Sequence, residues 1–302
     1  MRVPGRGRVV IHDHWGDHLD PWLSGLKRHF EDRRVPVEVW DRRTFRRGGL
    51  SPLKRPYRRL LGLWQRRALR SIVEDVDHMF IWNGQNDHHQ LLIQRCAEAG
   101  VPVSFLEVGY FPQKKFFTVD PRGINATSAL MEDSLDWVGE AELRALEEFR
   151  ESYLGARKWT GDGGFTLVPL QLASDTNIRD HSPFGDMQAF IRHCESAIEG
   201  PIVFKVHPLD DLEYESSHEV RRSGDFLDMA QRATRVVGLN STCLLESALL
   251  GAPTEALGDG FLRAHQHRQE KLLAALVHRQ IPVDAQDITP WLDRYAARRV
   301  NA

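Results

Sequence analysis

Cysteine is scarce in this sequence: its 302 residues include only Cys96, Cys194 and Cys243, and no two of them form a CxxC pair. This scarcity argues against a disulfide framework or a zinc site and favours a reducing compartment. No run approaches the ~20 apolar residues of a spanning helix, and the N-terminus lacks a secretory apolar region. The formal net charge of −2 gives no general bias towards nucleic acid. We therefore expect a cytoplasmic protein, with an association at the inner face of the membrane left open.

Several familiar catalytic motifs are also missing. The sequence contains no GxGxxG, GxxxxGK[ST], HExxH or GxSxG, so nothing supports a dinucleotide enzyme, a P-loop NTPase, a zincin or an α/β-hydrolase. No Asp-x-Asp pair follows a predicted strand, and Asp210 and Asp211 are adjacent. His12, His14 and His18 lie in one loop without an ordered carboxylate partner, which disfavours a metal site there. We expect no metal and no cofactor.

Short apolar segments alternate with segments of helical spacing along the whole chain, which is the pattern of an α/β protein. The composition, with 41% hydrophobic and 27% charged residues, fits a globular protein of two domains. The predicted strands are 8–12, 35–40, 78–82, 101–106, 165–170, 201–206 and 234–239. The predicted helices are 19–30, 87–99, 139–153, 184–198, 225–232 and 242–250, and residues 262–299 are expected to be mainly helical.

The clearest linker is KWTGDGG at 158–164, after which the alternation restarts. We predict an N-terminal Rossmann-like domain over 1–157 and a C-terminal one over 165–275. A helical tail, 276–302, could pack back on the N-terminal domain. In open α/β sheets ligands bind beyond the carboxyl ends of the strands, so residues that follow the strands are the candidate site.

Two acidic residues occupy such positions. Glu107, in Glu-Val-Gly-Tyr, follows the strand 101–106, and we expect its glycine to leave room for a ligand. Asp175 follows the strand 165–170 within Gln-Leu-Ala-Ser-Asp and could serve as a nucleophile or a base. Each also has a plainer interpretation, a helix cap or a salt-bridge partner for Glu107 and a helix N-cap or turn residue for Asp175.

Two further strand ends suit an anion. His207 of Lys-Val-His-Pro could donate to a phosphate or act catalytically as a general acid, and strand alternation would place Lys205 beside it as a second cation. The segment Gly238 to Thr242 leads into the helix 242–250, whose free N–H groups can bind phosphate. The plainer alternatives are a histidine satisfied at a sheet end and an ordinary N-cap.

Four segments together resemble the capsule polysaccharide synthesis/export (Kps-type) family of retaining β-Kdo glycosyltransferases. They are FLEVGYFPQKKFFTVDPRGINA (105–126), LVPLQLASDTNIRDHSPFGDMQAFI (167–191), VFKVHPLDD (203–211) and LNSTCLLESALLGAPTEALGDGF (239–261). The resemblance implies a GT-B-like fold, with two Rossmann-like domains facing a cleft. It implies transfer of a Kdo-type sugar from CMP-Kdo to a glycan or lipid-linked acceptor. The chain is short, and its Glu-Val-Gly lacks the second acidic or amide residue that relatives often have.

By this resemblance, Asp175 is the nucleophile, Glu107 is the acid/base residue and His207 contacts the donor phosphate. The two carboxylates would meet only when the cleft closes, which suits a reaction that must exclude water. The expected donor-binding residues are His207, Lys205, Asn240, Ser241, Thr242, Gly238 and Gln171.

Residues 42–70 contain eleven Lys or Arg and no acidic residue, with leucines and Trp64 interleaved. They could form a solvated helix face or a docking surface for anionic lipid or a lipid-linked acceptor. Nucleic acid is the least favoured partner, because no recognition module is visible.

Two other functions fit the same residues. One is a GT-B transferase with another activated donor, a UDP-sugar or a phosphoribosyl group, which predicts binding of a nucleotide or donor other than CMP. The other is a non-catalytic scaffold of a polysaccharide assembly complex, which predicts that Asp175 and Glu107 can be replaced without loss of function.

Overall fold

The computed structural model describes residues 7–12, 20–40, 73, 75–85, 87–173 and 175–298. Contacts divide the chain into two compact units, one formed by residues 1–129 and 279–302 and the other by 130–278. Each unit is built on a largely parallel sheet covered by helices, so the predicted α/β class is confirmed. The division differs from the boundary expected near residue 160, because α5 (Glu140–Leu154) falls in the second unit and the chain returns to the first at Arg279.

The first unit contains a six-stranded sheet of order β11-β5-β4-β3-β1-β2. Its strands are β1 (Arg8–His12), β2 (Val37–Trp40), β3 (Val76–Trp82), β4 (Val103–Val108), β5 (Phe116–Asp120) and β11 (Ile281–Pro282). Strands β1 to β4 pair in parallel, whereas β5 runs antiparallel to β4 and β11 runs antiparallel to β5. The hairpin β4–β5 was not expected from the sequence, which predicted only the parallel part.

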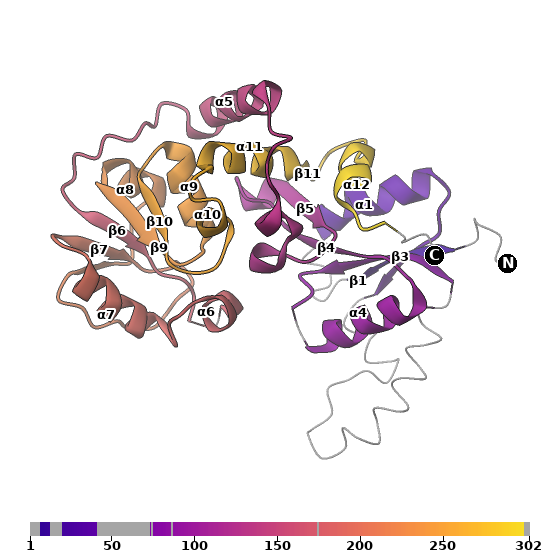
Figure 1. The fold of residues 1–302 in the computed structure, drawn as a ribbon, viewed down its shortest axis with the longest axis horizontal. Helices are drawn as coiled ribbons and strands as arrows, with labels where there is room; N and C mark the ends of the chain where they lie inside the picture. Colours follow the sequence, from indigo (N-terminus) through magenta and orange to yellow (C-terminus); the bar gives the residue numbers. More distant parts are fainter. Residues whose placement is uncertain are drawn as a thin grey trace, which may run out of the picture. The chain divides into compact units, whose positions relative to one another are not determined.

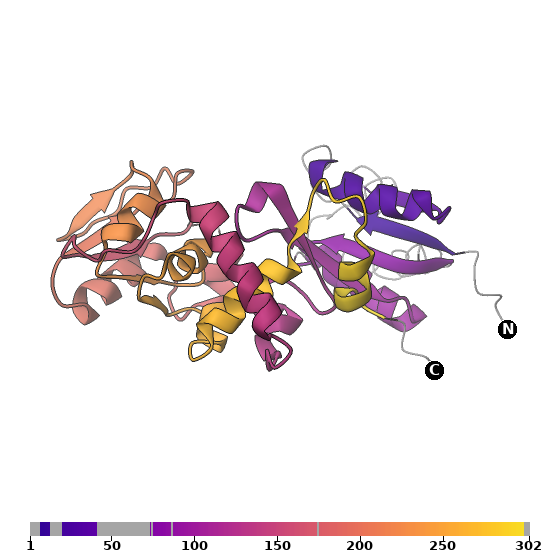
Figure 2. The same ribbon diagram turned by 90° about the horizontal axis from the view of Figure 1, so that it is seen from above.

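Helices cover both faces of this sheet (Figures 1 and 2). Helices α1 (Asp20–Asp32) and α12 (Thr289–Tyr295) pack on one face, and α4 (Asp87–Ala99) packs on the other. The alternation of β1 accounts for this arrangement, since Val9 and Ile11 face the first core and Val10 faces the second. Short 3-10 turns occur at Gln113–Lys115, Asn125–Thr127 and Ala129–Glu132.

The second unit contains a fully parallel five-stranded sheet of order β10-β9-β6-β7-β8. Its strands are β6 (Thr166–Pro169), β7 (Ile202–Lys205), β8 (Glu219–Arg221), β9 (Arg235–Gly238) and β10 (Thr254–Ala256). Every residue of β6 and β7 is buried, as expected for central parallel strands with apolar runs. The strand order places the carboxyl ends of β6, β7 and β9 next to one another, and we call this end of the sheet its carboxyl edge.

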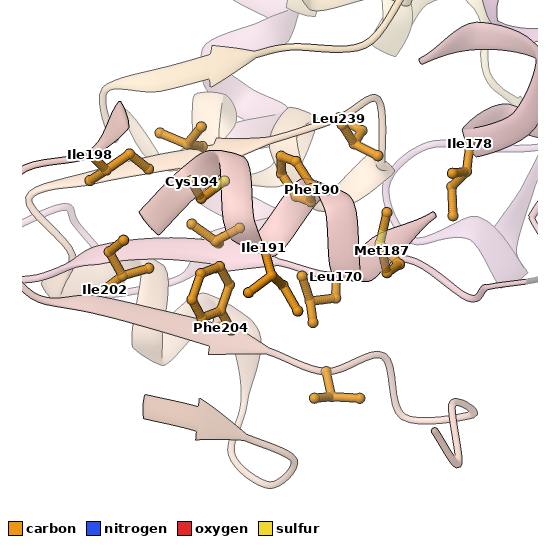
Figure 3. Packing of buried hydrophobic residues seen from close by; sticks show 13 residues of the cluster. Leu170, Ile178, Met187, Phe190, Ile191, Cys194, Ile198, Ile202, Phe204 and Leu239 are labelled. Atoms are coloured by element: carbon orange, nitrogen blue, oxygen red, sulfur yellow. The ribbon is translucent and has the colours of Figure 1, made fainter. Parts of the chain in front are cut away.

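The helices of this unit are α5, α6 (Thr176–His181), α7 (Met187–Ala197), α8 (Phe226–Arg232), α9 (Thr242–Leu250), α10 (Phe261–Ala264) and α11 (Gln269–Arg279). Helix α7 begins after Asp186, whose carboxylate accepts a bond from the Ala189 N–H, and it buries Phe190 and Ile191 (Figure 3). These side chains pack on Phe204 of β7 and Leu170 after β6, which fixes the sheet beneath the candidate site.

Helix α5 is joined to the rest of the second unit by polar contacts. The Arg150 guanidinium donates to the Leu249 carbonyl at 2.9 Å and to both carboxylate oxygens of Glu270 at 3.0 Å. The Tyr153 hydroxyl donates to Glu246 on α9, where burial raises the pKa of the carboxyl group. Glu246 therefore points towards α5.

Candidate functional site

The loop after β6 brings Asp175 to the carboxyl edge of the second sheet. Gln171 lies two residues beyond the strand, is only 5% exposed, and its Nε2 donates to Asp175 Oδ2 at 3.0 Å. The backbone N–H of Asp175 closes a turn onto the Leu172 carbonyl at 2.8 Å, and α6 begins at the next residue. Asp175 is half-buried, so its carboxylate is oriented by protein contacts while part of it remains accessible.

The loop after β9 reaches the same place. The Asn240 N–H donates to Gln171 Oε1 at 3.3 Å, which joins this loop to the one that carries Asp175. The Asn240 side-chain amide donates to the Asp259 carbonyl at 3.0 Å and to the His181 carbonyl at 3.4 Å. The Asn240 side chain thus holds neighbouring loops together.

Helix α9 starts at this loop with an ordinary cap. Ser241 is its N-cap, and the hydroxyl oxygen accepts a bond from the Cys243 N–H at 3.3 Å. Thr242 occupies the first helical position, and Gly238 is the last residue of β9. A small cavity adjoins the helix start, lined by Asn240, Ser241, Leu244, Leu245, Ala256, Gly260, Phe261 and Leu262. Its polar lining comes from Asn240 and Ser241, so the helix start offers a place for an anion next to apolar surface.

His207 lies in the turn after β7, and one of its ring nitrogens is already used. The Leu209 N–H donates to His207 Nδ1 at 3.1 Å, and the Asp210 N–H donates to the His207 carbonyl at 2.9 Å. Since Nδ1 accepts, the neutral ring carries its proton on Nε2, which is a donor. The half-buried ring can therefore offer one N–H to an anionic ligand.

The position of the Lys205 ammonium group differs from the sequence expectation, which placed it beside His207. Strand β7 ends at this residue, so strand alternation does not govern the position of His207 relative to it. The ammonium group is buried and donates to the carbonyls of Val206 at 3.1 Å and Arg222 at 2.9 Å. Burial lowers the pKa of this lysine. The ammonium group thus holds the Val206 backbone, which leads into the turn that carries His207.

In the first unit, Glu107 lies within β4, which continues to Val108, and it is paired with Thr118 of β5. The Asn83 side-chain amide donates to Glu107 Oε2 at 3.1 Å, and the Val108 N–H donates to Oε1 at 3.0 Å. Asn83 is in the left-handed region, with φ 66°, at the end of β3. No motif in the sequence indicated that Asn83 contacts this carboxylate.

Gly109 does not leave room for a ligand, contrary to our expectation. A Cβ at this position would lie 2.4 Å from the Phe116 Cβ and 3.2 Å from Gln280 Oε1. That Gln280 oxygen accepts bonds from the N–H groups of Tyr110 at 2.6 Å and Phe111 at 2.7 Å. The returning C-terminal segment thus fixes the backbone that follows Glu107, a role that no pattern in the sequence indicated.

We expect Gly109→Ala to lower the free energy of unfolding of the first unit by about 1–3 kcal/mol, because the added methyl group overpacks the contact with Phe116. Gly185→Ala is the matched control, since a Cβ there meets nothing within 4 Å and φ is not positive. Urea unfolding of both variants measures the difference. Equal stability of the two would contradict the close contact at Gly109.

A buried ion pair lies near Glu107. Asp120 Oδ2 and Arg279 Nη2 are 2.6 Å apart, with both side chains less than 10% exposed. Asp120 also accepts bonds from the Ser128 hydroxyl at 2.6 Å and from the N–H groups of Arg122 at 2.8 Å, Gly123 at 3.1 Å and Ala129 at 3.1 Å. A small cavity here is lined by Glu107, Tyr110, Asp120, Asn125, Ser128 and Arg279, among others. Gly123, Ile124 and Asn125 therefore form a wall of the space beside Glu107.

Among the described residues, no three His, Cys, Asp or Glu side chains gather as a metal site. Of the histidines considered for a metal, His12 packs edge-on against His89, with 4.9 Å between the ring centroids. His14 and His18 lie outside the described residues. Asp210 is engaged with the Tyr214 hydroxyl at 2.6 Å and the Leu212 N–H at 3.1 Å.

The basic stretch 42–70 also lies outside the described residues, so its proposed contact with a membrane or a lipid-linked acceptor stays a prediction. In the part of the chain that the structure describes, no helix has both the length and the apolar character to cross a bilayer.

A family model and a curated protein each match part of this chain. The model of the family described as "Capsule polysaccharide biosynthesis protein" matches residues 143–261, which include Asp175, His207 and the start of α9. Protein FixF of Sinorhizobium fredii (strain NBRC 101917 / NGR234) is 29% identical over 201 residues, covering 59% of this chain and 48% of that protein. The chain thus spans about half the length of this curated relative.

A solved structure extends the likeness to the fold. Thermosulfurimonas dismutans KpsC, beta Kdo 2,7 transferase, is similar with a TM-score of 0.59 at 16% identity, covering 92% of this chain and 96% of that chain. At this identity the likeness concerns architecture alone. The chain therefore has the GT-B-like α/β fold of that glycosyltransferase structure, and its residues 143–261 resemble the capsule polysaccharide biosynthesis family.

Proposed function

We propose that this protein is a glycosyltransferase of capsule or related surface polysaccharide synthesis, which moves a Kdo-type sugar from CMP-Kdo to a glycan or glycolipid acceptor. One observation carries the proposal: Gln171 links the Asp175 carboxylate to the loop that starts α9, at the carboxyl edge of a parallel sheet. A nucleophile beside an anion site is the arrangement that transfer from a phosphate-linked sugar requires. The match to the capsule family model and the fold of KpsC support the substrate class.

Asp175 is the nucleophile in this proposal. One carboxylate oxygen attacks the anomeric carbon, the bond from that carbon to the phosphate oxygen breaks, and CMP leaves with the electron pair. The acceptor hydroxyl then attacks the same carbon and the bond from that carbon to Asp175 breaks. The proton of the hydroxyl passes to a base. Two inversions give overall retention, as in other double displacements at sugar carbons. Glu107, which belongs to the first unit, is the proposed acid/base residue.

The donor phosphate is assigned to His207 Nε2 and to the start of α9 at Ser241 and Thr242. A histidine N–H and the positive end of a helix dipole both favour an anion. Lys205 stabilises the turn that carries His207 through its hydrogen bond to the Val206 carbonyl. The cysteines do not compete as nucleophiles, since burial raises the thiol pKa to about 12 for Cys96 and Cys194 and to about 11 for Cys243.

The donor is tested by incubating the purified protein separately with CMP-Kdo, UDP-glucose and phosphoribosyl diphosphate and measuring the released CMP, UDP or diphosphate. We expect enzyme-dependent release of CMP alone. Release of UDP or diphosphate instead would retain a transferase but contradict the Kdo donor. No release from any donor, with a correctly folded protein, would favour the scaffold alternative.

His207→Ala should weaken CMP binding by about 1–3 kcal/mol, the scale of a hydrogen bond to a charged group. Isothermal titration calorimetry measures this change, and His267→Ala, at an exposed position on the α10–α11 connection, is the control. Unchanged CMP affinity in the His207 variant would show that this ring does not touch the donor.

A further inference from the structure

Gln171 stands at the centre of the second sheet's carboxyl edge. It follows β6, which lies between β9 and β7 in the sheet. The preceding residue, Leu170, donates its N–H to the Lys205 carbonyl at 2.8 Å, which extends the strand pairing towards β7. On the other side, the Gln171 side-chain oxygen accepts a hydrogen bond from the Asn240 N–H, in the loop after β9. One side chain therefore joins the loop bearing Asp175 to the loop that starts α9.

The orientation of this amide is determined by its partners. Nε2 faces the Asp175 carboxylate and can only donate there, while Oε1 faces the Asn240 N–H and can only accept. The reversed amide would set oxygen against a carboxylate and an NH₂ group against an N–H, so both contacts would become repulsive. A buried amide with both ends satisfied is a rigid link, because breaking either bond leaves a desolvated polar group.

A role as a donor ligand, which the sequence suggested, fits this geometry poorly. The side chain is 5% exposed, and each end of its amide already has a protein partner. The link also continues beyond Asn240, whose own side chain binds the Asp259 carbonyl at 3.0 Å. Loops that follow β6, β9 and β10 are thus tied into one network through Gln171 and Asn240.

We propose that Gln171 is a positioning residue, which holds the Asp175 carboxylate in register with the start of α9 and so sets the nucleophile relative to the donor phosphate. This inference rests on the proposed function. Holding one carboxylate oxygen at Nε2 fixes the plane of the carboxylate and directs the other oxygen towards its target. A displacement of about 1 Å at such a centre can cost about 100-fold in rate without loss of binding.

Two substitutions separate the two halves of the link. Gln171→Glu keeps an acceptor for the Asn240 N–H but sets a carboxylate against Asp175. Gln171→Met keeps the length of the side chain and removes both bonds. Gln188→Met is the matched control, because the Gln188 amide also uses both ends, donating to the Glu215 carbonyl at 2.7 Å and accepting from the Glu215 N–H at 3.0 Å, without bonds to the proposed site.

We expect Gln171→Glu to lower kcat for CMP release from CMP-Kdo by about 100-fold, with CMP affinity within threefold of the wild type. Gln171→Met should lower kcat comparably and also weaken CMP binding, since the Asn240 loop is released. Gln188→Met should leave both quantities unchanged. Full kcat in both Gln171 variants, or equal losses in the Gln188 control, would overturn the positioning role.

A second readout does not depend on turnover. NMR of protein labelled at the aspartate carboxyl carbons and backbone nitrogens reports the Asp175 signal, assigned with Asp175→Asn, and amide exchange at Asn240. We expect Gln171→Met to shift the Asp175 carboxyl signal and to accelerate Asn240 exchange, while Gln171→Glu affects mainly the former. Failure of the wild type to release CMP would count against the proposed function alone. Unchanged NMR signals in both variants would overturn the inference whether or not the wild type is active.

Discussion

We expect Asp175→Asn to lower the rate of CMP release from CMP-Kdo by at least about 10⁴-fold, while CMP should bind with unchanged affinity. The expected loss has the size seen when a nucleophile is removed, because an amide cannot form the glycosyl ester. The asparagine oxygen can still accept the bond from Gln171 Nε2, so the loop should keep its conformation. Steady-state turnover and calorimetric titration with CMP measure the two effects on the same preparation.

The matched control is Asp211→Asn, which makes the same chemical change at an exposed position in the loop after His207. It should retain wild-type turnover. Appreciable residual turnover in Asp175→Asn would remove Asp175 from the role of nucleophile. A joint loss of turnover and CMP affinity would instead place Asp175 among the donor-binding groups.

Asp120→Ala is expected to lower the free energy of unfolding of the first unit by about 3–5 kcal/mol. The substitution leaves the Arg279 guanidinium buried without its carboxylate and removes the acceptor of the Ser128 hydroxyl and of several backbone N–H groups. Urea unfolding with hydrogen exchange resolved over β4 and β5 assigns the loss to this unit.

The control for this prediction is an exposed ion pair. Lys27 and Glu31 are 3.7 Å apart on the surface of α1, with both side chains about half exposed, so Glu31→Ala should cost less than about 1 kcal/mol. Asp120→Asn provides a milder change of the same site, since it keeps the shape. A loss below 1 kcal/mol in Asp120→Ala would show that the tail beginning at Arg279 is not anchored by this pair.

The parallel framework was accessible from the sequence because its signals are local. Apolar runs such as RVVIH and FTLVPL coincide with β1 and β6, and the helices 87–99 and 242–250 have the bounds that periodicity indicated. The rule that ligands lie beyond strand ends directed attention to Asp175, His207 and the start of α9. The structure brings Gln171, Asp175 and Asn240 together there through hydrogen bonds of 3.0 and 3.3 Å.

The remaining features depend on contacts between distant parts of the chain. Strand β5 pairs antiparallel with β4, and β11 joins it from more than 150 residues later, which no local pattern encodes. For the same reason the sequence did not reveal Arg279 as the partner of Asp120 or Gln280 as the support of the Tyr110 backbone. Gly109 was misread because its nearest neighbour, Phe116, belongs to that unexpected strand.

We propose that a cytidine-linked donor binds at the carboxyl edge of the second sheet. Calorimetric titration of the purified protein with CMP, UMP, AMP and GMP tests it most directly. We predict saturable binding of CMP, with the other three at least about tenfold weaker, which corresponds to about 1.4 kcal/mol. Preference for another nucleotide, or no binding by any of the four, would contradict this account.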